Sequence, residues 1–476
     1  MLSINQKKNQ HLLWRAGFGP GIGNVKDLSS ISQKKLFEQL LRSSAKTPAK
    51  IDGVPNFLAD MYNQAGGEMK PDNLNKEQKQ MIRQQSRDGI KKLNTTWLNE
   101  MVNGEDQLRE KMAFFWHGHF ACRIVNIFFQ EQLLDTVRTN ALGNFGDLLK
   151  EVSKSAAMLS FLNNQQNKKQ HPNENFAREV MELFTLGRGN YTENDIKEGA
   201  RAFTGWGFNL KGDFMDRPFQ HDTGTKTFLG QTGNFNGDDI LNILLEQKQT
   251  AKFITKKIYK YFVNEKVDDS KVEFLAARFY KSNYDIKGLL TDIYTSEWFY
   301  DDKNIGTKIK SPVELIAGVR RMVPMQIENE DVQLVLEKAT NQVLFYPPNV
   351  AGWPGGKTWI DSSSLMLRLR IPQLLTDSDE FSVTPKEDDD TNMGQEGERK
   401  NKRFIVKSTI DWNVVTAAFA NTSRENLLDS IKDVVLQTHS KTSNVVLENY
   451  LDKSDRNNYI KTAVVQLMST PEYQLC

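Results

Sequence analysis

Two histidines, His117 and His119, stand one glycine apart in the segment FWHGHF (115–120). Neutral imidazoles bind divalent metals and transfer protons near neutral pH, so the pair is a candidate metal site or acid/base pair. On an uninterrupted helix the two side chains would point about 200° apart and could not share a metal. They would converge in extended backbone or if the helix broke at Gly118. A buried, hydrogen-bonded pair without a chemical role is the alternative.

A pair of carboxylates provides the second set of candidates, in the segment NENFAREVMELFTL (173–186). Glu179 and Glu182 stand three residues apart, on the side turned away from the apolar stripe, so they project together. They could supply two oxygen ligands, or one acid and one base, if a cavity desolvates them. Arg178 stands four residues before Glu182 and could pair with it, as it would on an ordinary solvated helix face.

The third set lies in QHDTGTKTFLG (220–230), where His221 and Asp222 are adjacent. Asp-Thr-Gly is the loop of aspartic proteases, but that mechanism needs two such aspartates sharing a proton, and here there is one. A turn capped by Asp222 is the simpler interpretation. As the functional alternative, His221 and Asp222 would contribute to a metal site.

Helices must position these groups, because apolar residues recur at three- and four-residue spacing through most of the chain. Asn173 and Gly187 are expected to cap the two ends of the helix at 173–186, and Thr192 with Asp195 resembles a capping box for the next helix. The fold class is therefore mainly α, a large multi-helix body with a small inserted antiparallel β-meander at about 206–232. Further expectations are helices at about 75–103, 105–120 and 253–262, an ordered loop at 346–364 and a mobile loop at about 378–407.

The length allows either one large core or two packed lobes. We expect a single large helical domain over residues 1–476, with its core at about 10–375 and the C-terminal helices 408–476 packed on it. The 62 basic and 60 acidic residues nearly cancel, so we expect no nucleic-acid partner. No apolar run is long enough to span a membrane. Two cysteines are too few for a disulfide framework, and the first residues lack the pattern of a secretory signal, so cytoplasmic residence is expected.

Ordered motifs along nearly the whole chain resemble a bacterial family called domain of unknown function 1800. The resemblance covers roughly residues 10–375 and the tail STPEYQL, and it rests on HLLWRAGFGP, LREKMAFFWHGHF, NENFAREVMELFTLGRGNYTENDIKEGARAFTGW, HDTGTKTFLGQTG, AKFITKKIYKYFV, SPVELIAGVRRM and FYPPNVAGWPGGKTWIDSSSLMLR. It implies no settled activity. It does imply a sulfatase-like partner, often encoded nearby, and export for many members. The family's recurring polar positions match Arg15, His117, His119, Asn173, Arg178, Glu179, Glu182, His221, Asp222, Lys226, Trp353 and Trp359 here.

The resulting hypothesis is a hydrolytic or oxidative enzyme in which these groups line one pocket. Glu179, Glu182 and Asp222 would act as catalytic acids and bases, and His117, His119 and His221 would hold a divalent metal as cofactor. Arg178, Lys226 and Trp353 would bind the substrate, the two cations through an anionic group. The competing hypothesis is a non-catalytic scaffold or binding protein in which the same groups form a buried polar network.

Overall fold

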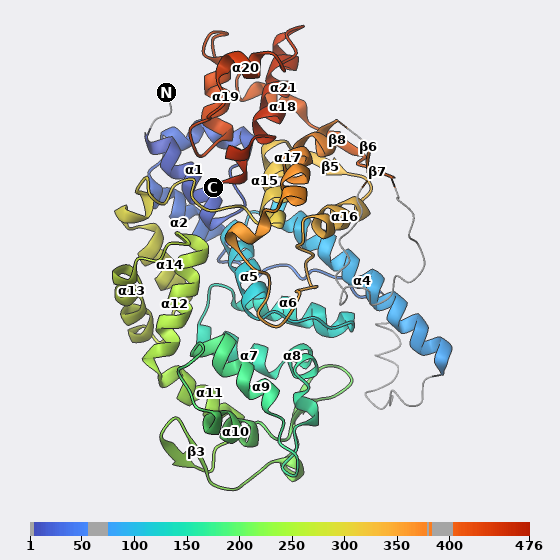
Figure 1. Cartoon of the computed structure of the whole chain (residues 1–476), viewed down its shortest axis with the longest axis vertical. Coiled ribbons are helices and arrows are strands. Elements are labelled where there is room, and N and C mark those ends of the chain that lie inside the picture. Colours follow the sequence, from blue (N-terminus) through green and yellow to red (C-terminus); the bar gives the residue numbers. More distant parts are fainter. Residues whose placement is uncertain (1–3, 56–74, 378–379, 383–402) are drawn as a thin grey trace.

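The computed structural model describes residues 4–55, 75–377, 380–382 and 403–476. Helices make up most of it, which confirms the predicted mainly-α class (Figure 1). The N-terminal part consists of α1 (Ile4–Ala16), the 3-10 helix η1 (Ile22–Ser29), α2 (Gln33–Ser43) and the long α4 (Lys76–Asn103). The first half of α4 is mostly exposed, whereas its second half buries Leu93, Trp97 and Met101, as the polar-to-apolar change along its sequence predicts.

Helix α5 (Gln107–His119) is the centre of the molecule, and α1, α2, α4 and α6 (Ile127–Asn140) pack against it (Figure 1). All of its residues except Gly118 are buried. Its buried charges have partners on neighbouring elements, because unpaired charges in a core are costly. The N–H of Arg138 Nε is shared between the two carboxylate oxygens of Glu110, each at 3.0 Å, and Lys111 forms an ion pair with Glu314.

The middle of the chain forms the lower and left parts of Figure 1. The helix predicted at 173–186 begins at its Asn173 cap and continues as a π-helix to Thr185, and Gly187 follows at a positive φ of 79°. The elements of this middle part are α7 (Phe145–Lys154), α8 (Ala156–Phe161), η3 (Asn164–Gln166), α9 (Glu174–Glu179), the π-helix η4 (Val180–Thr185), α10 (Glu193–Ala202), α11 (Gly237–Glu246), α12 (Lys248–Phe262), α13 (Asp269–Lys281), α14 (Ile286–Tyr294) and η6 (Glu297–Tyr300).

The predicted β region consists of two antiparallel hairpins between α10 and α11. Strand β1 (Trp206–Phe208) pairs with β2 (Phe214–Asp216), and β3 (Lys226–Phe228) pairs with β4 (Gln231–Gly233). The 3-10 helix η5 (Pro218–Gln220) separates them. The capping box of Thr192 and Asp195 is present at the start of α10, and Asp195 also accepts the Leu229 N–H at 2.8 Å, which fastens the second hairpin to that helix.

The last third of the chain returns to the central body. Strand β5 (Met325–Ile327) pairs with β8 (Ser408–Ile410), which joins the C-terminal segment to the end of α15 (Pro312–Met322). Most of the predicted mobile loop at 378–407 lies outside the described residues. The remaining elements are α16 (Asp331–Ala339), η7 (Gly356–Trp359), α17 (Ser362–Thr376), β6 (Glu380–Ser382), β7 (Arg403–Ile405), α18 (Trp412–Ala417), α19 (Leu427–Val435), α20 (Asn444–Glu448), α21 (Arg456–Met468) and η8 (Pro471–Gln474).

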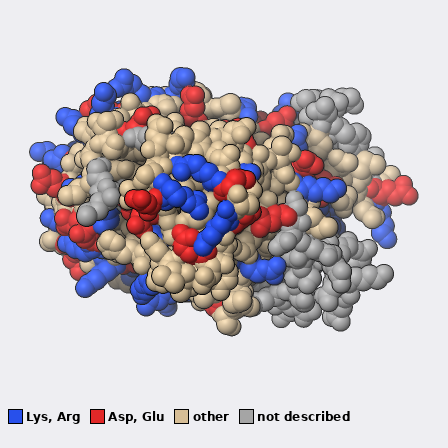
Figure 2. Space-filling view, turned by 90° about the horizontal axis from the view of Figure 1, so that it is seen from above, with Lys and Arg blue, Asp and Glu red and all other residues tan. Residues whose placement is uncertain are grey.

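The surface seen from above Figure 1 has basic and acidic side chains interspersed (Figure 2). Within the described ranges, none of the helices is long and apolar enough to cross a lipid bilayer.

Candidate functional site

His117 lies in an aromatic enclosure beneath the loop that precedes α17. Its ring centroid is 5.1 Å from that of Trp97, 5.0 Å from Phe345 and 5.4 Å from Trp353. The Nε2 atom accepts the Phe345 N–H at 3.1 Å. Burial lowers the pKa of this histidine to about 3, so the imidazole is neutral at physiological pH. Phe345 has a positive φ of 68°, a conformation rare for a bulky side chain, and the bond to His117 helps to hold it.

His119 points to the other side of α5, because the helix continues through Gly118. Its Nε2 lies 3.3 Å from the Phe184 carbonyl oxygen, and its Nδ1 lies 3.0 Å from Lys257 Nζ. A carbonyl oxygen can only accept, so Nε2 donates and Nδ1 accepts from the lysine. Burial, followed by the charge of Lys257, holds the pKa of His119 well below its usual range. Of the two geometries that the sequence leaves open for His117 and His119, the structure has the continuous helix, on which the two side chains point apart.

Lys257, on α12, joins His119 to the end of the π-helix. Its Nζ also donates to the Leu183 carbonyl oxygen at 3.3 Å, and burial lowers its pKa to about 8. The last carbonyl groups of a helix lack partners within the helix. Here Lys257 and His119 donate hydrogen bonds to two of these carbonyl groups, those of Leu183 and Phe184. A cation at this end is also favoured by the helix dipole.

Glu179, the last residue of α9, and Glu182, in the π-helix η4, are both half-buried. Glu182 Oε2 accepts a hydrogen bond from Tyr191 OH at 2.5 Å, and burial together with this bond raises the pKa of Tyr191 to about 12. Glu179 has no hydrogen bond to the described residues. Burial and the neighbouring charge of Glu182 raise the pKa of Glu179. The two acids thus interact electrostatically, as their spacing predicts.

Asp222 is held by Arg201 of α10, through bonds of 2.7 Å from Nε and 3.1 Å from Nη2. The bidentate bond from Arg201 lowers the pKa of Asp222. Asp222 Oδ1 also accepts the Gly224 N–H at 2.8 Å, so the predicted capped turn is present. The adjacent His221 directs Nδ1 to the Thr204 carbonyl oxygen at 3.0 Å, and Lys226 Nζ donates to the carbonyl oxygens of Asp222 and Gly224 at 2.5 and 3.0 Å.

Arg178 faces outward and forms ion pairs with Glu174 and Glu193 at 3.2 and 3.0 Å. The predicted pairing with Glu182 is thus replaced by pairing with residues on its own first turn and on α10. Trp353 packs over His117, in a loop whose Gly352 lies against the Gly118 carbonyl.

The candidate residues fall into two groups, one around α5 and the π-helix and the other around the second hairpin. Within the described residues, no group of three or more His, Cys, Asp or Glu side chains is arranged to hold a metal ion. The contacts join His119 to Lys257 and the π-helix, and Glu182 to Tyr191. Within the described part of the chain, no hydrogen bond or ion pair joins any of these to His221 or Asp222.

Sequence reasoning missed Lys257, Tyr191 and Glu337. Lys257 belongs to the segment FITKKIYKYF, whose pattern favours a core helix with lysines on its outer side; Lys256 and Lys260 are exposed, but Lys257 turns inward. Its position three residues after the buried Ile254 is the available signal. Glu337 is a buried acid that accepts from the Leu344 N–H at 3.1 Å, next to the residue that His117 holds.

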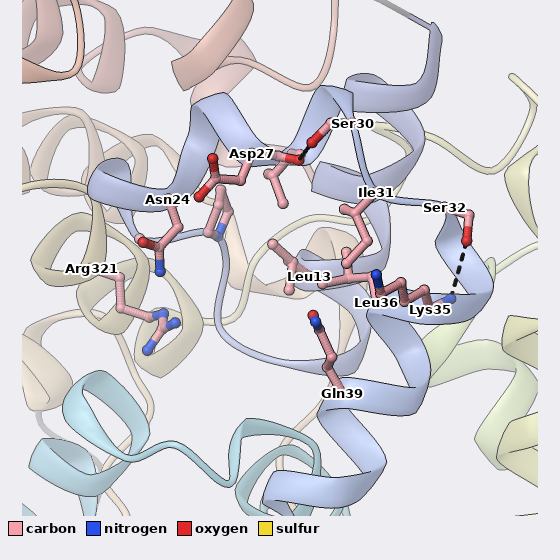
Figure 3. Close-up of a pocket in the computed structure, with 13 residues that line it drawn as sticks. Leu13, Asn24, Asp27, Ser30, Ile31, Ser32, Lys35, Leu36, Gln39 and Arg321 are labelled. Carbon is pink, nitrogen blue, oxygen red and sulfur yellow. Dashed lines mark hydrogen bonds between the residues drawn. The ribbon is translucent and has the colours of Figure 1, made fainter.

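Two surface hollows lie elsewhere, around the end of α15. One, of about 780 Å³, is bounded by α1, η1, α2 and Arg321 (Figure 3). The second, of about 680 Å³, lies between α15 and the β5–β8 pair. Gly21 and Arg321 line both.

Comparison with known proteins gives one family. Residues 11–475 match a family model described as "Protein of unknown function (DUF1800)". No curated protein and no solved structure matches the chain.

Proposed function

The chain belongs to the DUF1800 family, and from this premise we propose that it is a non-catalytic helical scaffold or binding protein. The observation that carries the proposal is that candidate groups already form hydrogen bonds to other residues of the protein. His119 and Asp222 each bond to partners on another element, and Lys226 bonds to backbone carbonyl oxygens of the turn before its own strand. Buried polar networks satisfied in this way specify a fold and need no substrate.

The proposed partner is a sulfatase-like protein encoded nearby, which the family resemblance implies. A scaffold acts through what it binds, so the two proteins should associate when they are mixed. Co-purification of the pair supports this part of the proposal, and two independent elution profiles at micromolar concentrations contradict it.

Metal analysis of the purified protein, combined with unfolding measurements, tests the main proposal. We expect far less than one bound metal per chain. The double variant His117→Ala, His119→Ala should lose about 4 kcal/mol or more of unfolding free energy, because it empties two enclosed sites and leaves polar groups unpaired. The matched control is His171→Ala, His439→Ala, since both of these side chains are exposed. It should change stability by less than about 0.5 kcal/mol.

A stoichiometric metal that disappears in the His117, His119 double variant would contradict the scaffold proposal. It would favour the metal enzyme instead. A metal retained in the double variant and lost in the control would place the ion on the surface, and the scaffold proposal would stand.

A second candidate function is acid/base catalysis at Glu179 and Glu182, and one specific observation favours it. Glu179 is a half-buried carboxylate without a hydrogen-bond partner in the described chain, and it adjoins a π-helix, a rare element found frequently at functional sites. A raised pKa suits a general acid. A hydrolytic activity lost in Glu179→Gln and kept in the exposed control Glu77→Gln would establish this candidate.

A further inference from the structure

The two arginines that end α15 lie between the two surface hollows. Arg321 lines both hollows, and Arg320 lines the hollow next to the β5–β8 pair. We call Arg320 and Arg321 the arginine junction. Neither arginine belongs to the networks around His117, His119 or Asp222, so a ligand site at the junction does not depend on the proposed function.

The arginine junction carries positive charge that the described residues do not neutralise by an ion pair. Burial lowers the pKa of each arginine to about 10, although the charge of Glu330 opposes this at Arg320, and both remain protonated at neutral pH. Arg320 is 4% exposed and donates from Nη1 to Gln333 Oε1 at 2.6 Å, while its Nε is buried with no hydrogen-bond partner. A buried guanidinium in this state is costly unless an anion approaches it.

The guanidinium of Arg321 is fixed in direction. Its Nε donates to the Gly19 carbonyl oxygen at 2.9 Å and its Nη1 to the Val102 carbonyl oxygen at 2.6 Å. These neutral acceptors orient the group without neutralising it, and Nη2 remains without a hydrogen bond to the described residues. A donor held in this way loses little entropy when it binds a ligand.

The hollow bounded by η1 and α2 offers both polar and apolar surface beside Arg321 (Figure 3). Asn24, Lys35 and Gln39 provide polar groups, and Leu13 and Ile31 lie within the same hollow. Asp27 is the acid among its lining residues. In the second hollow the acid is Asp411, whose carboxylate already caps α18 by accepting the Asn413 N–H at 3.1 Å. A volume of this size suits a small molecule.

We propose that the arginine junction binds a small organic oxyanion, with its carboxylate or phosphate group on Arg321 and its apolar body in the hollow bounded by η1 and α2. Arginine recognises such groups through planar, charge-assisted hydrogen bonds. The apolar side chains of the hollow then distinguish an organic anion from a bare inorganic one.

Isothermal titration with three probes tests the proposal: octanoate, inorganic phosphate and octanol. Octanoate combines both required features, so it should bind most tightly. Phosphate should bind more weakly, and octanol should show no measurable binding. Equal binding of octanoate and octanol overturns the oxyanion assignment, and absence of octanoate binding up to about 10 mM overturns the site, since that limit corresponds to a very weak complex.

Two variants locate the binding. Arg321→Gln should weaken octanoate binding by about tenfold or more, the loss expected for one charge-assisted hydrogen bond. Since Arg321 also anchors two carbonyl groups, this variant could lose stability, and a second variant keeps the test decisive. Gly21 lines both hollows, has an extended conformation and has open space at its missing Cβ.

The Gly21→Phe side chain should therefore fill the space where the two hollows meet and reduce octanoate affinity by about tenfold. The melting temperature of this variant should stay within about 2 °C of that of the wild type. Gly355→Phe is the matched control, because Gly355 also has open space at its Cβ and lies outside both hollows. Octanoate affinity unchanged in Gly21→Phe, or equally weakened in Gly355→Phe, overturns the proposed location.

Discussion

Glu337 shows how a single buried acid links this fold to pH. Its Oε2 accepts hydrogen bonds from Asn94 Nδ2 at 2.8 Å and from the Leu344 N–H at 3.1 Å, whereas its Oε1 is buried without a partner. Burial raises the pKa of the carboxyl group from 4.5 to about 7. A proton on Oε1 is therefore favoured in the folded protein under mildly acidic conditions.

Because the folded protein holds this proton more tightly than the unfolded chain, Glu337 costs stability as the pH rises. The stability that comes from the tighter binding of this proton in the folded protein is fully present below about pH 4.5. It is lost as the pH rises through about 7. We expect Glu337→Gln to be more stable than the wild type at pH 8 by an amount of the order of 2 kcal/mol. The gain should shrink toward zero near pH 5. Urea unfolding at pH 5, 6.5 and 8 measures it.

Glu425→Gln is the control variant, since Glu425 is exposed, and we expect it to leave the unfolding free energy within about 0.5 kcal/mol of the wild type. A gain in Glu337→Gln that is the same at all three pH values would show that packing, and not ionisation, is responsible.

At the scale of single residues, the sequence predicts which side chains are candidates but not what they touch. The sequence leaves open whether His117 and His119 converge, and the continuous helix through Gly118 is the geometry in which they point apart. The partner of His119 could not be predicted, because Lys257 is 138 residues away along the chain. The same holds for Asp222, whose Arg201 partner depends on how the hairpin folds back on α10.

At the scale of elements, the loop before α17 depends on one close approach of backbone to backbone. Gly352 has a positive φ of 84°, and a Cβ on it would lie 2.4 Å from the Gly118 carbonyl oxygen. A side chain there would push the loop away from the end of α5 and from His117. We expect Gly352→Ala to cost about 3 kcal/mol of unfolding free energy, measured by chemical denaturation.

Gly355→Ala is the matched control in the same loop, since Gly355 has a negative φ of −100° and open space at its missing Cβ. It should cost less than about 1 kcal/mol. Equal losses for the two alanine variants would contradict the role assigned to the contact between Gly352 and Gly118.

Element boundaries were more predictable than their internal geometry. The sequence predicts both ends of the 173–186 helix from Asn173 and Gly187, and both are confirmed. It does not predict the π-helix within it. Lys257 and His119 bind carbonyl groups of this π-helix from other helices, and such contacts between distant segments are not visible in the local sequence. The two hairpins were likewise predicted as β structure but not as separate pairs.

At the scale of the whole molecule, the last residues join distant parts of the chain. Lys310 N–H donates to the Gln474 carbonyl oxygen at 2.9 Å, and Lys310 Nζ to the Tyr473 carbonyl oxygen at 2.5 Å. Arg368 Nε donates to Gln474 Oε1 at 3.0 Å. The Tyr473 ring is fully buried and lies 6.2 Å from that of Trp14. The first, middle and final parts of the chain thus share one packed region.

We expect Tyr473→Ala to destabilise the whole molecule by about 3–5 kcal/mol, because it opens a large cavity at this shared region. Calorimetry should show one transition at lower temperature. Tyr450→Ala is the control, since Tyr450 is 66% exposed. A separate low-temperature transition, with the main transition unchanged, would show that the C-terminal helices unfold independently.

The mainly-α class was predictable from hydrophobic periodicity over long segments, and the family from motifs along the chain. Which distant segments pack against each other was not predictable. Hydrophobic spacing indicates which face of an element is buried but not which neighbouring element covers that face. The β5–β8 pair illustrates this, since Met325 pairs with Ile410, which lies far along the chain beyond α16, η7 and α17.

Helix α4 passes from solvent into the core within one continuous element. Its exposed first turns are rich in lysine, arginine and glutamine, and the buried part begins near Gly89, which lies against the Gly53 carbonyl. Deuterium should therefore enter the backbone amides of α4 in a gradient, fastest before Arg87 and slowest beyond Ile90. Trypsin should cleave after the exposed lysine and arginine residues in the first half of α4. The second half of the helix, which includes the buried Trp97, should remain packed in the core.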